Sequence, residues 1–240
     1  MKVPVVQGVI DRRILINYQI EPDVLAAILP PPFEPQLVNG MGIAGICLIR
    51  LKDIRPKFLP SGFGIGSENA AHRIAVRWRE NETWREGVYI PRRDTSSRIN
   101  TLLGGTLFPG LHYQAQFEVD ETDDDYQIRL HSNDGNTHLA IHAHLTDDLP
   151  THSVFNSLMD VSDFFERGSL GYSATKQNGY YDGLELRSFN WHVQPLTVDH
   201  VTSSFFDDEQ LFPPDSIRFD NALLMRGINH EWHEKAALYC

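Results

Sequence analysis

The sequence predicts a mainly β protein with a few short α-helices, folded from antiparallel strands. Short segments with alternating apolar and polar residues recur along the 240 residues, and this period of two is typical of strands with one buried face. Gly, Pro, Asn and Asp, the residues of tight turns, separate these segments. Apolar residues make up 41% of the chain and charged residues 22%, so the composition is that of a globular protein. The length predicts a single domain over residues 1–240.

The first elements are two strands with a helix between them. Ile14–Ile20 and Ile43–Leu51 are apolar runs rich in β-branched residues, which favour strands. Pro22 suits the first position of a helix over Asp23–Leu29, and a run of three prolines ends that helix.

A hairpin follows, formed by Ala70–Arg79 and Trp84–Ile90. An even loop length places Tyr89 inside, opposite Ile74, whereas an odd length places its two neighbours inside, so the register stays open. In the first strand the even positions are mostly apolar. The odd positions are expected to face water because they include Arg73, Arg77 and Arg79.

Glu68 and His72 are the titratable residues closest to the apolar face of this hairpin. If the strand begins before Ala70, both side chains point to the apolar side; otherwise Glu68 lies in a solvated loop. A carboxylate in an apolar interior is unfavourable unless it is paired or open to a water-filled cavity. Desolvation would raise its pKa, which is a common condition for acid–base chemistry.

The clearest hairpin pairs Tyr126–Ser132 with Thr137–Leu145. Asp134-Gly135 in the connection suits a type I′ turn. This pairing sets apolar residues opposite each other on one face, Ile128 with Ile141 and Leu130 with Leu139. The segment before it, Tyr113–Val119, alternates in the same way and is also expected to be a strand.

The other face of this hairpin carries His138, His142 and His144, with His131 across from His138. Imidazoles on paired strands bind zinc in some proteins, but Arg129 on the same face disfavours a divalent cation. No metal is therefore expected. No cofactor is expected either, because the chain lacks the phosphate-binding and dinucleotide-binding glycine motifs.

The remaining elements are two short helices and two strands. Asp94 or Thr95 suits the N-cap of the first helix, and Gly follows each helix directly. The helices are expected at Ser96–Leu103 and Val161–Arg167, and the strands at Glu185–Val193 and Ile217–Ile228. Many antiparallel strands with short helices favour a barrel or a strongly curved sheet.

Charge and cysteine content limit the partners and the compartment. Acids outnumber bases 32 to 21, and this negative charge repels nucleic-acid phosphates and anionic lipids, so neither nucleic acid nor membrane is an expected partner. No apolar run approaches the ~20 residues of a membrane-spanning helix. The absence of a signal peptide and the free thiols favour the cytoplasm. Of the two thiols, Cys47 is expected to be buried and inert, and Cys240 is terminal.

Several segments carry a family resemblance through their order and spacing. They are Ile14–Pro30, Val38-Asn39-Gly40, Arg55–Gly66, Ser67-Glu68-Asn69, Glu86-Gly87-Val88-Tyr89-Ile90, Asp160–Gly171, Phe189-Asn190-Trp191 and Gln194-Pro195-Leu196. Together they resemble the YqjF-like family of uncharacterised proteins, which is related to acetoacetate decarboxylases. The resemblance covers about residues 12 to 232. It implies an acetoacetate decarboxylase-like antiparallel β-barrel whose central cavity holds a small organic molecule.

The chain departs from the decarboxylases at their reactive lysine. In that family, Glu-Gly-x-Tyr is followed by a helix and then by Gly-Phe-Pro-Lys-Lys, of which one lysine forms a Schiff base with the substrate. Here the sequence Glu86-Gly87-Val88-Tyr89 is present, but Gly110 and Leu111 stand at the two lysine positions, and no lysine occurs between Lys57 and Lys176. Decarboxylation through an imine is therefore excluded at this site.

The resemblance places Glu68 at the carboxylate of the family's cavity. Glu68 and His72 are the expected catalytic residues, with Glu68 as a general acid or base. The expected ligand-binding residues on the cavity wall are Tyr89, His112, Tyr113 and Trp191. A small keto or hydroxy acid is the expected ligand, and positive charge for an anion is available from Arg73, Arg92, Arg93 and Arg98.

Three functions stay open. The first is an enzyme with lysine-independent acid–base chemistry, the second is a non-catalytic small-molecule binder or sensor, and the third is a structural barrel with a packed interior. An open pocket with Glu68 paired to a second titratable group favours catalysis. An open pocket with Glu68 salt-bridged to an Arg favours binding, and a packed interior means that no ligand binds. Exposed strand edges are compatible with a homo-oligomer.

Overall fold

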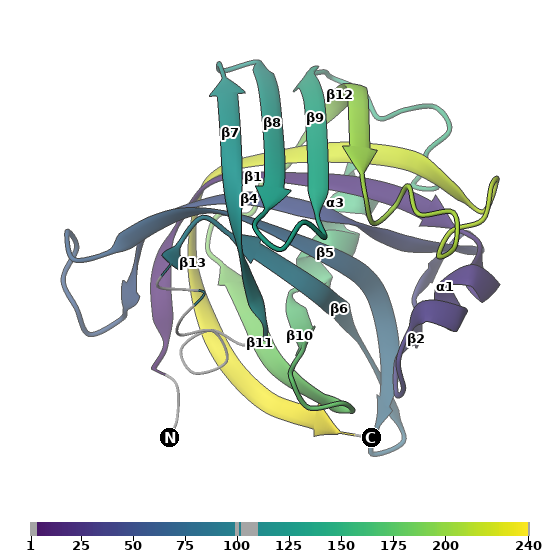
Figure 1. Cartoon of the computed structure of the whole chain (residues 1–240), viewed down its shortest axis with the longest axis horizontal. Helices are drawn as coiled ribbons and strands as arrows, with labels where there is room; N and C mark the ends of the chain where they lie inside the picture. The colour runs from purple at the N-terminus through teal and green to yellow at the C-terminus, as the bar shows by residue number, and fades with distance from the viewer. Residues whose placement is uncertain (1–3, 99–100, 102–109, 240) are drawn as a thin grey trace.

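The computed structural model describes residues 4–98, 101 and 110–239, and Figure 1 shows their arrangement. Two α-helices and one extended sheet make up the described regular structure. In chain order these elements are β1 (Val6–Ile20), α1 (Pro22–Ile28), β2 (Glu34–Pro35), β3 (Leu37–Val38), β4 (Met41–Pro56), β5 (Ile65–Glu80), β6 (Thr83–Thr95), β7 (His112–Glu121), β8 (Asp125–Ser132), β9 (His138–Leu145), α3 (Leu158–Arg167), β10 (Leu170–Ala174), β11 (Tyr180–Ser188), β12 (Gln194–Ser203) and β13 (Ile217–Tyr239). The mainly β class is confirmed.

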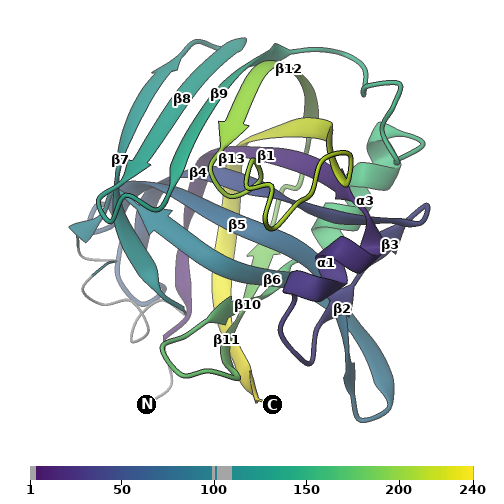
Figure 2. The same cartoon turned by 45° about the vertical axis from the view of Figure 1, so that its right-hand side comes forward.

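The sheet closes on itself twice. Its strand order is β11-β10-β6-β7-β8-β9-β12-β13-β1-β4-β5-β2, and two further pairings join β5 to β6 and β11 to β13. Two rings result, which share the wall β13-β1-β4-β5-β6. Strands β7, β8, β9 and β12 complete the first ring and stand above the shared wall in Figure 1, whereas β10 and β11 complete the second ring below it. Figure 2 shows the same division from another side.

The shared wall is buried on both faces because each ring encloses its own apolar core. Ile14 and Ile16 belong to the core of the first ring, and Leu15 between them belongs to the second core. Helix α3 covers the second core with Val161 and Phe165. Successive side chains of a strand point to opposite faces, so the wall strands are continuously apolar where both faces are covered.

This double burial corrects the expectation that the odd positions of the first hairpin face water. Arg77 and Arg79 are exposed as expected. Arg73, however, is only 4% exposed, and its neighbours Ala71 and Ala75 are buried with it. The expectation was wrong at Arg73 because α3 covers this face, and its Phe165 ring lies 4.4 Å from the Arg73 guanidinium carbon.

Most expected elements are confirmed. In the hairpin of β8 and β9, Ile128 pairs with Ile141 and Leu130 with Leu139, and in the first hairpin Ile74 pairs with Tyr89. Almost all pairings are antiparallel, but β6 pairs in parallel with both β7 and β10. Helix α3 begins earlier than expected because the Ser157 hydroxyl caps it by accepting from the Asp160 amide at 3.1 Å.

Four strands were not expected, and one is shifted. The short strands β2 and β3 were missed together with β10 and β12, and β11 ends at Ser188 rather than continuing to Val193. The helix expected at Ser96–Leu103 lies largely outside the described residues, although the Ser97 amide donates to Thr95 Oγ1 at its start. In the described part of the chain, no helix is long and apolar enough to cross a membrane.

Candidate functional site

Two adjoining cavities lie inside the second ring, against the shared wall. Their volumes are about 90 Å³ and about 60 Å³. We call the larger one the arginine cavity; its polar and aromatic lining consists chiefly of Arg13, Cys47, Arg73, Arg93, Phe165 and Trp191. The smaller, adjoining cavity is lined in part by Asn69, Asp94 and His112. Arg93 lines both cavities.

Strand register brings the polar groups of the arginine cavity together. Cys47 on β4 pairs with Ala71 on β5, which pairs with Arg93 on β6. Arg73 pairs with Gly45 and so lies diagonally next to Cys47 on the same face. Arg13 on β1 is the diagonal neighbour of Cys47 on the other side. Because Ala71 carries only a methyl group, space is left between the thiol and the Arg93 guanidinium.

The three guanidinium groups of this cavity have no carboxylate partner among the described residues. Arg13 donates from Nε to the Cys47 Sγ at 3.0 Å. Arg93 donates from Nε to the Ser173 hydroxyl at 3.1 Å. Arg73 donates to the Asn17 side-chain oxygen, while its own Nε is buried without a partner.

Burial without a neighbouring anion lowers the pKa of two of these guanidinium groups. It lowers the pKa of Arg73 to about 10, and the neighbouring charge of Arg13 adds to the effect. Burial also lowers the pKa of Arg93 to about 10. Both groups still carry a positive charge at neutral pH. A buried, unpaired cation is unfavourable, so the arrangement favours the entry of an anion.

The size and chemistry of the arginine cavity limit the anion that fits. A guanidinium group forms paired hydrogen bonds with carboxylate or phosphate oxygens. A cavity of about 90 Å³ is smaller than the ~150 Å³ that holds a benzene ring. The space therefore suits an anion of a few heavy atoms and is too small for a nucleotide.

The adjoining cavity contains a neutral imidazole. Burial, together with the charge of Arg93, lowers the pKa of His112 to about 4. Its Nδ1 lies 3.3 Å from the Gly110 carbonyl oxygen. Asp94 is paired with Arg92 at 2.8 Å, although burial leaves the pKa of Asp94 raised. Near pH 7, His112 can therefore orient a ligand by hydrogen bonding but not by charge.

Glu68 lies on the other face of β5, in a group of four charged residues that we call the Arg–Glu cluster. Its members are Arg12, Arg50, Glu68 and Glu121, and each arginine contacts both carboxylates. Glu68 accepts from Arg12 at 2.6 Å and from Arg50 at 2.5 Å. Glu121 accepts from Arg12 at 2.5 Å and from Arg50 at 2.6 Å. Arg12 is fully buried, and the Glu68 side chain is 16% exposed.

Charges within the Arg–Glu cluster stabilise one another, and Arg50 also lies 3.8 Å from Asp11 outside the cluster. Burial opposes the charged form of Glu121, but the hydrogen bonds and charges of Arg12 and Arg50 outweigh it and lower the pKa of the carboxyl. The pKa of Arg50 is raised by Glu68 and Glu121 in spite of desolvation. Glu68 does not line either of the two cavities, whereas its neighbours Ser67 and Asn69 line the smaller one.

The other residues predicted for the site are divided between the two rings. Trp191 lines the arginine cavity and donates from Nε1 to the Ser162 hydroxyl at 2.9 Å. His72 lies in the core of the first ring, 5.0 Å from the Phe205 ring, and burial lowers its pKa to about 4. Neither of its nitrogens has a hydrogen-bond partner among the residues that the structure describes.

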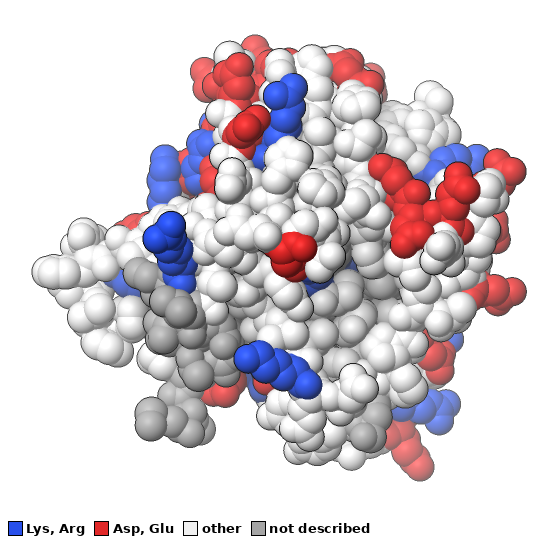
Figure 3. Space-filling model, viewed as in Figure 1, with Lys and Arg blue, Asp and Glu red and all other residues white. Residues whose placement is uncertain are grey.

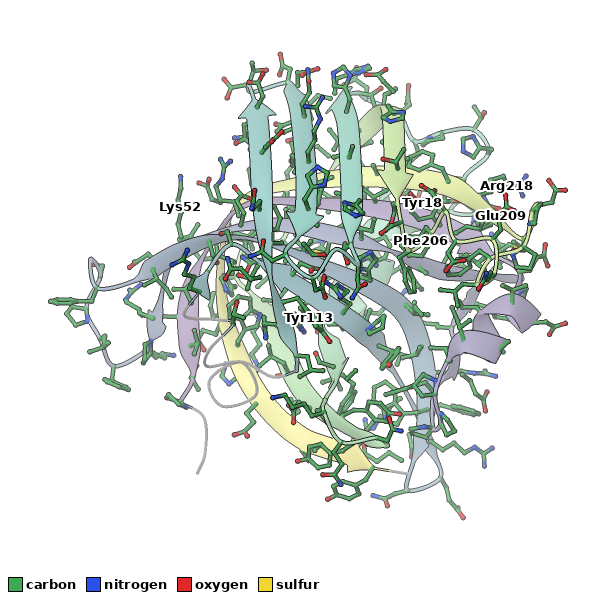
Figure 4. The ribbon with its side chains drawn as sticks, viewed as in Figure 1. Tyr18, Lys52, Tyr113, Phe206, Glu209 and Arg218 are labelled. Atoms are coloured by element: carbon green, nitrogen blue, oxygen red, sulfur yellow. The ribbon has the colours of Figure 1, made fainter. Side chains whose placement is uncertain are left out.

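Tyr89 and Tyr113 lie away from both cavities. The Tyr89 ring packs 5.2 Å from Phe33 in the aromatic part of the first core, and burial raises the pKa of its hydroxyl to about 12. Tyr113, at the lower end of β7 in Figure 4, lies 4.0 Å beneath the Arg92 guanidinium. The structure thus brings His112 and Trp191 to the cavities but not these two tyrosines.

Sequence reasoning missed Arg13 and Cys47 as cavity residues and assigned Arg73 to the solvent. A signal was present at β5, where Arg73 stands between Ala71 and Ala75. Small residues on both sides of an arginine leave room for its long side chain to lie along the strand. A solvated strand face does not require such small neighbours.

No lysine of the described chain reaches the cavities. Lys52, for example, is 60% exposed and points outward in Figure 4. At Gly110 a side chain would have its Cβ 2.4 Å from the Ser173 Cβ, and the backbone φ is +82°. Position 110 is therefore not accessible to a lysine without rearrangement, which agrees with the exclusion of an imine there.

The histidines of β8 and β9 form pairs on an exposed face. His131 and His138 contact each other through Nδ1 atoms at 2.9 Å. His142 contacts Asp125 at 2.8 Å, and His144 contacts Asp199 at 3.1 Å. Within the part of the chain that the structure describes, no group of three or more His, Cys, Asp or Glu residues is arranged to hold a metal ion.

The family model DUF2071, described as "Uncharacterized conserved protein (COG2071)", matches residues 10–223. No curated protein matches the chain. Among solved structures, acetoacetate decarboxylase from Legionella pneumophila subsp. pneumophila str. Philadelphia 1 is similar, with a TM-score of 0.60 and 12% identity over 97% of this chain and 87% of that chain.

Two further solved structures have the same fold. An acetoacetate decarboxylase-like enzyme from Sphingomonas wittichii RW1 has a TM-score of 0.59 and 10% identity over 100% of this chain and 94% of that one. The enduracididine biosynthesis enzyme MppR, complexed with pyruvate, has a TM-score of 0.54 and 10% identity over 100% of this chain and 91% of that one. At such identities the likeness concerns the fold alone.

Proposed function

The chain belongs to the DUF2071 family of uncharacterised conserved proteins, and from this starting point we propose that it binds a small organic acid as an anion in the arginine cavity. The fold is that of acetoacetate decarboxylase-like proteins. MppR, which shares this fold, was obtained in complex with pyruvate. A three-carbon acid of that kind has a size that suits a cavity of about 90 Å³. Placement among the YqjF-like proteins and in the cytoplasm stays a prediction.

One observation carries the proposal: three guanidinium groups line one small cavity, and no carboxylate of the described residues neutralises them. Elsewhere in the same sheet, the fully buried Arg12 is neutralised by two carboxylates. A buried cation that the protein leaves unpaired is instead a binding group for an external anion.

The remaining groups take supporting roles in this proposal. Arg73 and Arg93 hold the carboxylate, Trp191 supplies an apolar wall, and the neutral His112 orients the far end of the ligand. Glu68 is a positioning residue that fixes the wall through Arg12 and Arg50. Both Glu68 oxygens accept from guanidinium groups, so the carboxylate is already engaged within the protein, and this pairing favours binding over acid–base chemistry by Glu68.

Thermal denaturation of Arg73→Met tests the proposal. In the unchanged protein, pyruvate and acetoacetate should raise the melting temperature, whereas their uncharged amides should not. A ligand at a hundredfold excess over its Kd stabilises a protein by about 2.7 kcal/mol. Arg73→Met should lose most of this stabilisation because the variant removes one of the three cations.

Arg77→Met is the matched control. Arg77 lies on the same strand, is 47% exposed and pairs with Glu34 at the surface. This variant should keep the full response to carboxylates. The proposal is wrong if no small carboxylate raises the melting temperature of the unchanged protein, or if Arg73→Met responds as strongly as Arg77→Met.

A further inference from the structure

Cys47 is a buried free thiol in the wall of the arginine cavity. It is only 3% exposed and belongs to the second apolar core, yet it also lines the arginine cavity. Its sulfur accepts a hydrogen bond from the Arg13 guanidinium at 3.0 Å. Strand register places it diagonally next to Arg73 and in line with Arg93 across Ala71.

This surrounding differs from that of an inert core cysteine. The Cys47 sulfur accepts from one guanidinium and lies near two further cations, so the groups around it attract an anionic ligand to the sulfur. Arg73 supplies an independent sign of a ligand at the same place. It is 4% exposed and lines the same cavity, and in the described part of the chain its buried Nε has no hydrogen-bond partner.

On the basis of the function proposed above, we propose that Cys47 is the nucleophile of the arginine cavity and adds reversibly to the keto carbon of a bound 2-oxo acid. The Cys47 sulfur lies 3.0 Å from the Arg13 Nε and next to Arg73 by strand register. A carboxylate bound by these guanidinium groups brings the carbon next to it closest to the sulfur, and in a 2-oxo acid that carbon is the electrophilic keto carbon.

The step balances without a further reactant. The sulfur–carbon bond forms at C2 of the acid while the carbon–oxygen π bond breaks, and the former carbonyl oxygen takes the proton that the thiol gives up. The product is a thiohemiketal. The negative charge that develops on the oxygen lies among guanidinium groups, which stabilise such a charge in a site with little water. Reversal releases the unchanged acid.

Iodoacetate is a suitable probe because its electrophilic carbon also lies next to its carboxylate. Alkylation forms the sulfur–carbon bond and releases iodide, with the thiol proton going to solvent. We expect Cys47, in a Cys240→Ser background, to react about tenfold faster with iodoacetate than with neutral iodoacetamide, because the arginines attract the carboxylate. The free thiol N-acetylcysteine, which lacks such cations, should show no preference for iodoacetate.

Variants of β5 separate the charge effect from general accessibility. Arg73→Met should slow alkylation by iodoacetate about tenfold and change the rate with iodoacetamide little. Arg77→Met should change neither rate. If Cys47 shows no preference for iodoacetate in the unchanged background, or if Arg73→Met slows both reagents equally, the inference is wrong.

Protection experiments test the covalent step itself. Pyruvate and lactate carry the same carboxylate, but only pyruvate has an electrophilic C2. Pyruvate should protect Cys47 from iodoacetamide at a lower concentration than lactate does, because it also masks the sulfur. Equal protection by the two acids would overturn the addition step.

The outcomes also separate this inference from the proposed function. If carboxylates raise the melting temperature but Cys47 does not react with either reagent, the cavity binds anions without a nucleophile, and only the inference fails. If carboxylates neither stabilise the protein nor protect Cys47, both fail.

Discussion

Arg12 and Arg73 illustrate two ways of burying a guanidinium in one sheet. Arg12 is fully buried and contacts Glu68 and Glu121, so its charge is neutralised within the protein. Arg73 is almost as deeply buried, but among the described residues its polar contact is with the neutral side chain of Asn17. The first arrangement stabilises the structure as it stands, and the second is completed by a ligand.

Glu68→Gln is expected to destabilise the protein by about 3 kcal/mol or more, because breaking a buried ion pair leaves a charge uncompensated. The fully buried Arg12 would then share the single carboxylate of Glu121 with Arg50. Urea denaturation at pH 7 measures this loss as a shift of the midpoint at an unchanged slope.

Glu80→Gln is the control for Glu68→Gln. Glu80 pairs with Arg85 at 3.0 Å, and both side chains are about half exposed, at 47% and 56%. Loss of such a surface pair changes stability by less than about 1 kcal/mol. An equally small effect of Glu68→Gln, together with a loss of carboxylate binding, would assign Glu68 to the ligand site instead.

At the scale of elements, β5 determines the site because its two faces belong to different rings. Glu68 and His72 point to the first ring, whereas Asn69, Ala71 and Arg73 point to the second. Strand β4 pairs with β5, β1 pairs with β4, and both show the same division. Close contact between these strands keeps Cys47, Arg13 and Arg73 in their relative positions.

Gly45→Ala is expected to disrupt this contact. The added Cβ would lie 2.0 Å from the Ile16 carbonyl oxygen, and because this atom belongs to the backbone, β1 and β4 would have to move apart. Overpacking of a core typically costs about 1–3 kcal/mol, and a backbone clash lies at the upper end or above it. Thermal or urea denaturation measures the loss.

Gly168→Ala serves as the comparison for Gly45→Ala. At position 168 the nearest atom to an added Cβ is the Phe164 carbonyl oxygen at 3.4 Å, and φ is −73°, which suits any residue. A change of less than about 1 kcal/mol is expected. Similar effects of the two variants would show that the close approach at Gly45 is not a constraint.

The elements that the sequence predicts well are those with a local signal. The facing apolar residues of β8 and β9 predict their register, and the alternation from Ala70 to Trp78 identifies the face of β5 that packs in the first ring. The expected type I′ turn at Asp134-Gly135 was wrong, because only Gly135 of the two has a positive φ. β12 was missed because polar residues such as Asp199 and His200 dilute its alternation. β10 was missed because it has only five residues.

The site was less predictable than the fold because it depends on pairing between distant strands. Strand alternation and the family resemblance both singled out Glu68, but its partners Arg12 and Arg50, which it shares with Glu121, lie on other strands and are identified only by the structure. The cavity requires β4, β5 and β6 side by side, so that Cys47, Ala71 and Arg93 fall in one line. No pattern within a single strand contains this relation.

At the scale of the whole molecule, charge is divided between outside and inside. Acidic side chains gather along the upper edge and the right side of the face in Figure 3, in line with the net charge of −11. The arginine cavity inside the second ring is instead lined by cations. An anionic ligand is therefore attracted by the arginines once it is inside the protein. The negative surface repels it little from further away, because salt screens surface charges beyond ~8–10 Å.

Acid pH is expected to destabilise the protein before its carboxylates titrate. Burial lowers the pKa values of His72, His112 and His230 from 6.5 to about 4. The unfolded chain therefore binds up to three more protons than the folded chain between these pH values. Stability is complete above pH 6.5 and falls as the pH drops toward 4, by about 5 kcal/mol at most between pH 7 and pH 5.

Urea denaturation at pH 7 and pH 5 measures this dependence. His72→Phe should reduce the loss by about a third, because it removes one of three buried imidazoles from an apolar core. The same stability at both pH values would contradict the expectation. The low pKa of Glu121 acts in a lower pH range, since the stability that an ion-paired carboxylate gives is lost only when it protonates.

The wall that separates the two rings has a consequence for how this protein tolerates change. Arg12 and Arg13 are consecutive in β1, yet Arg12 belongs to the Arg–Glu cluster and Arg13 to the arginine cavity. A shift of a few tenths of an ångström in that strand alters both neighbourhoods together. A substitution in this shared wall therefore affects both interiors, and natural variation along it has to be compatible with both at once.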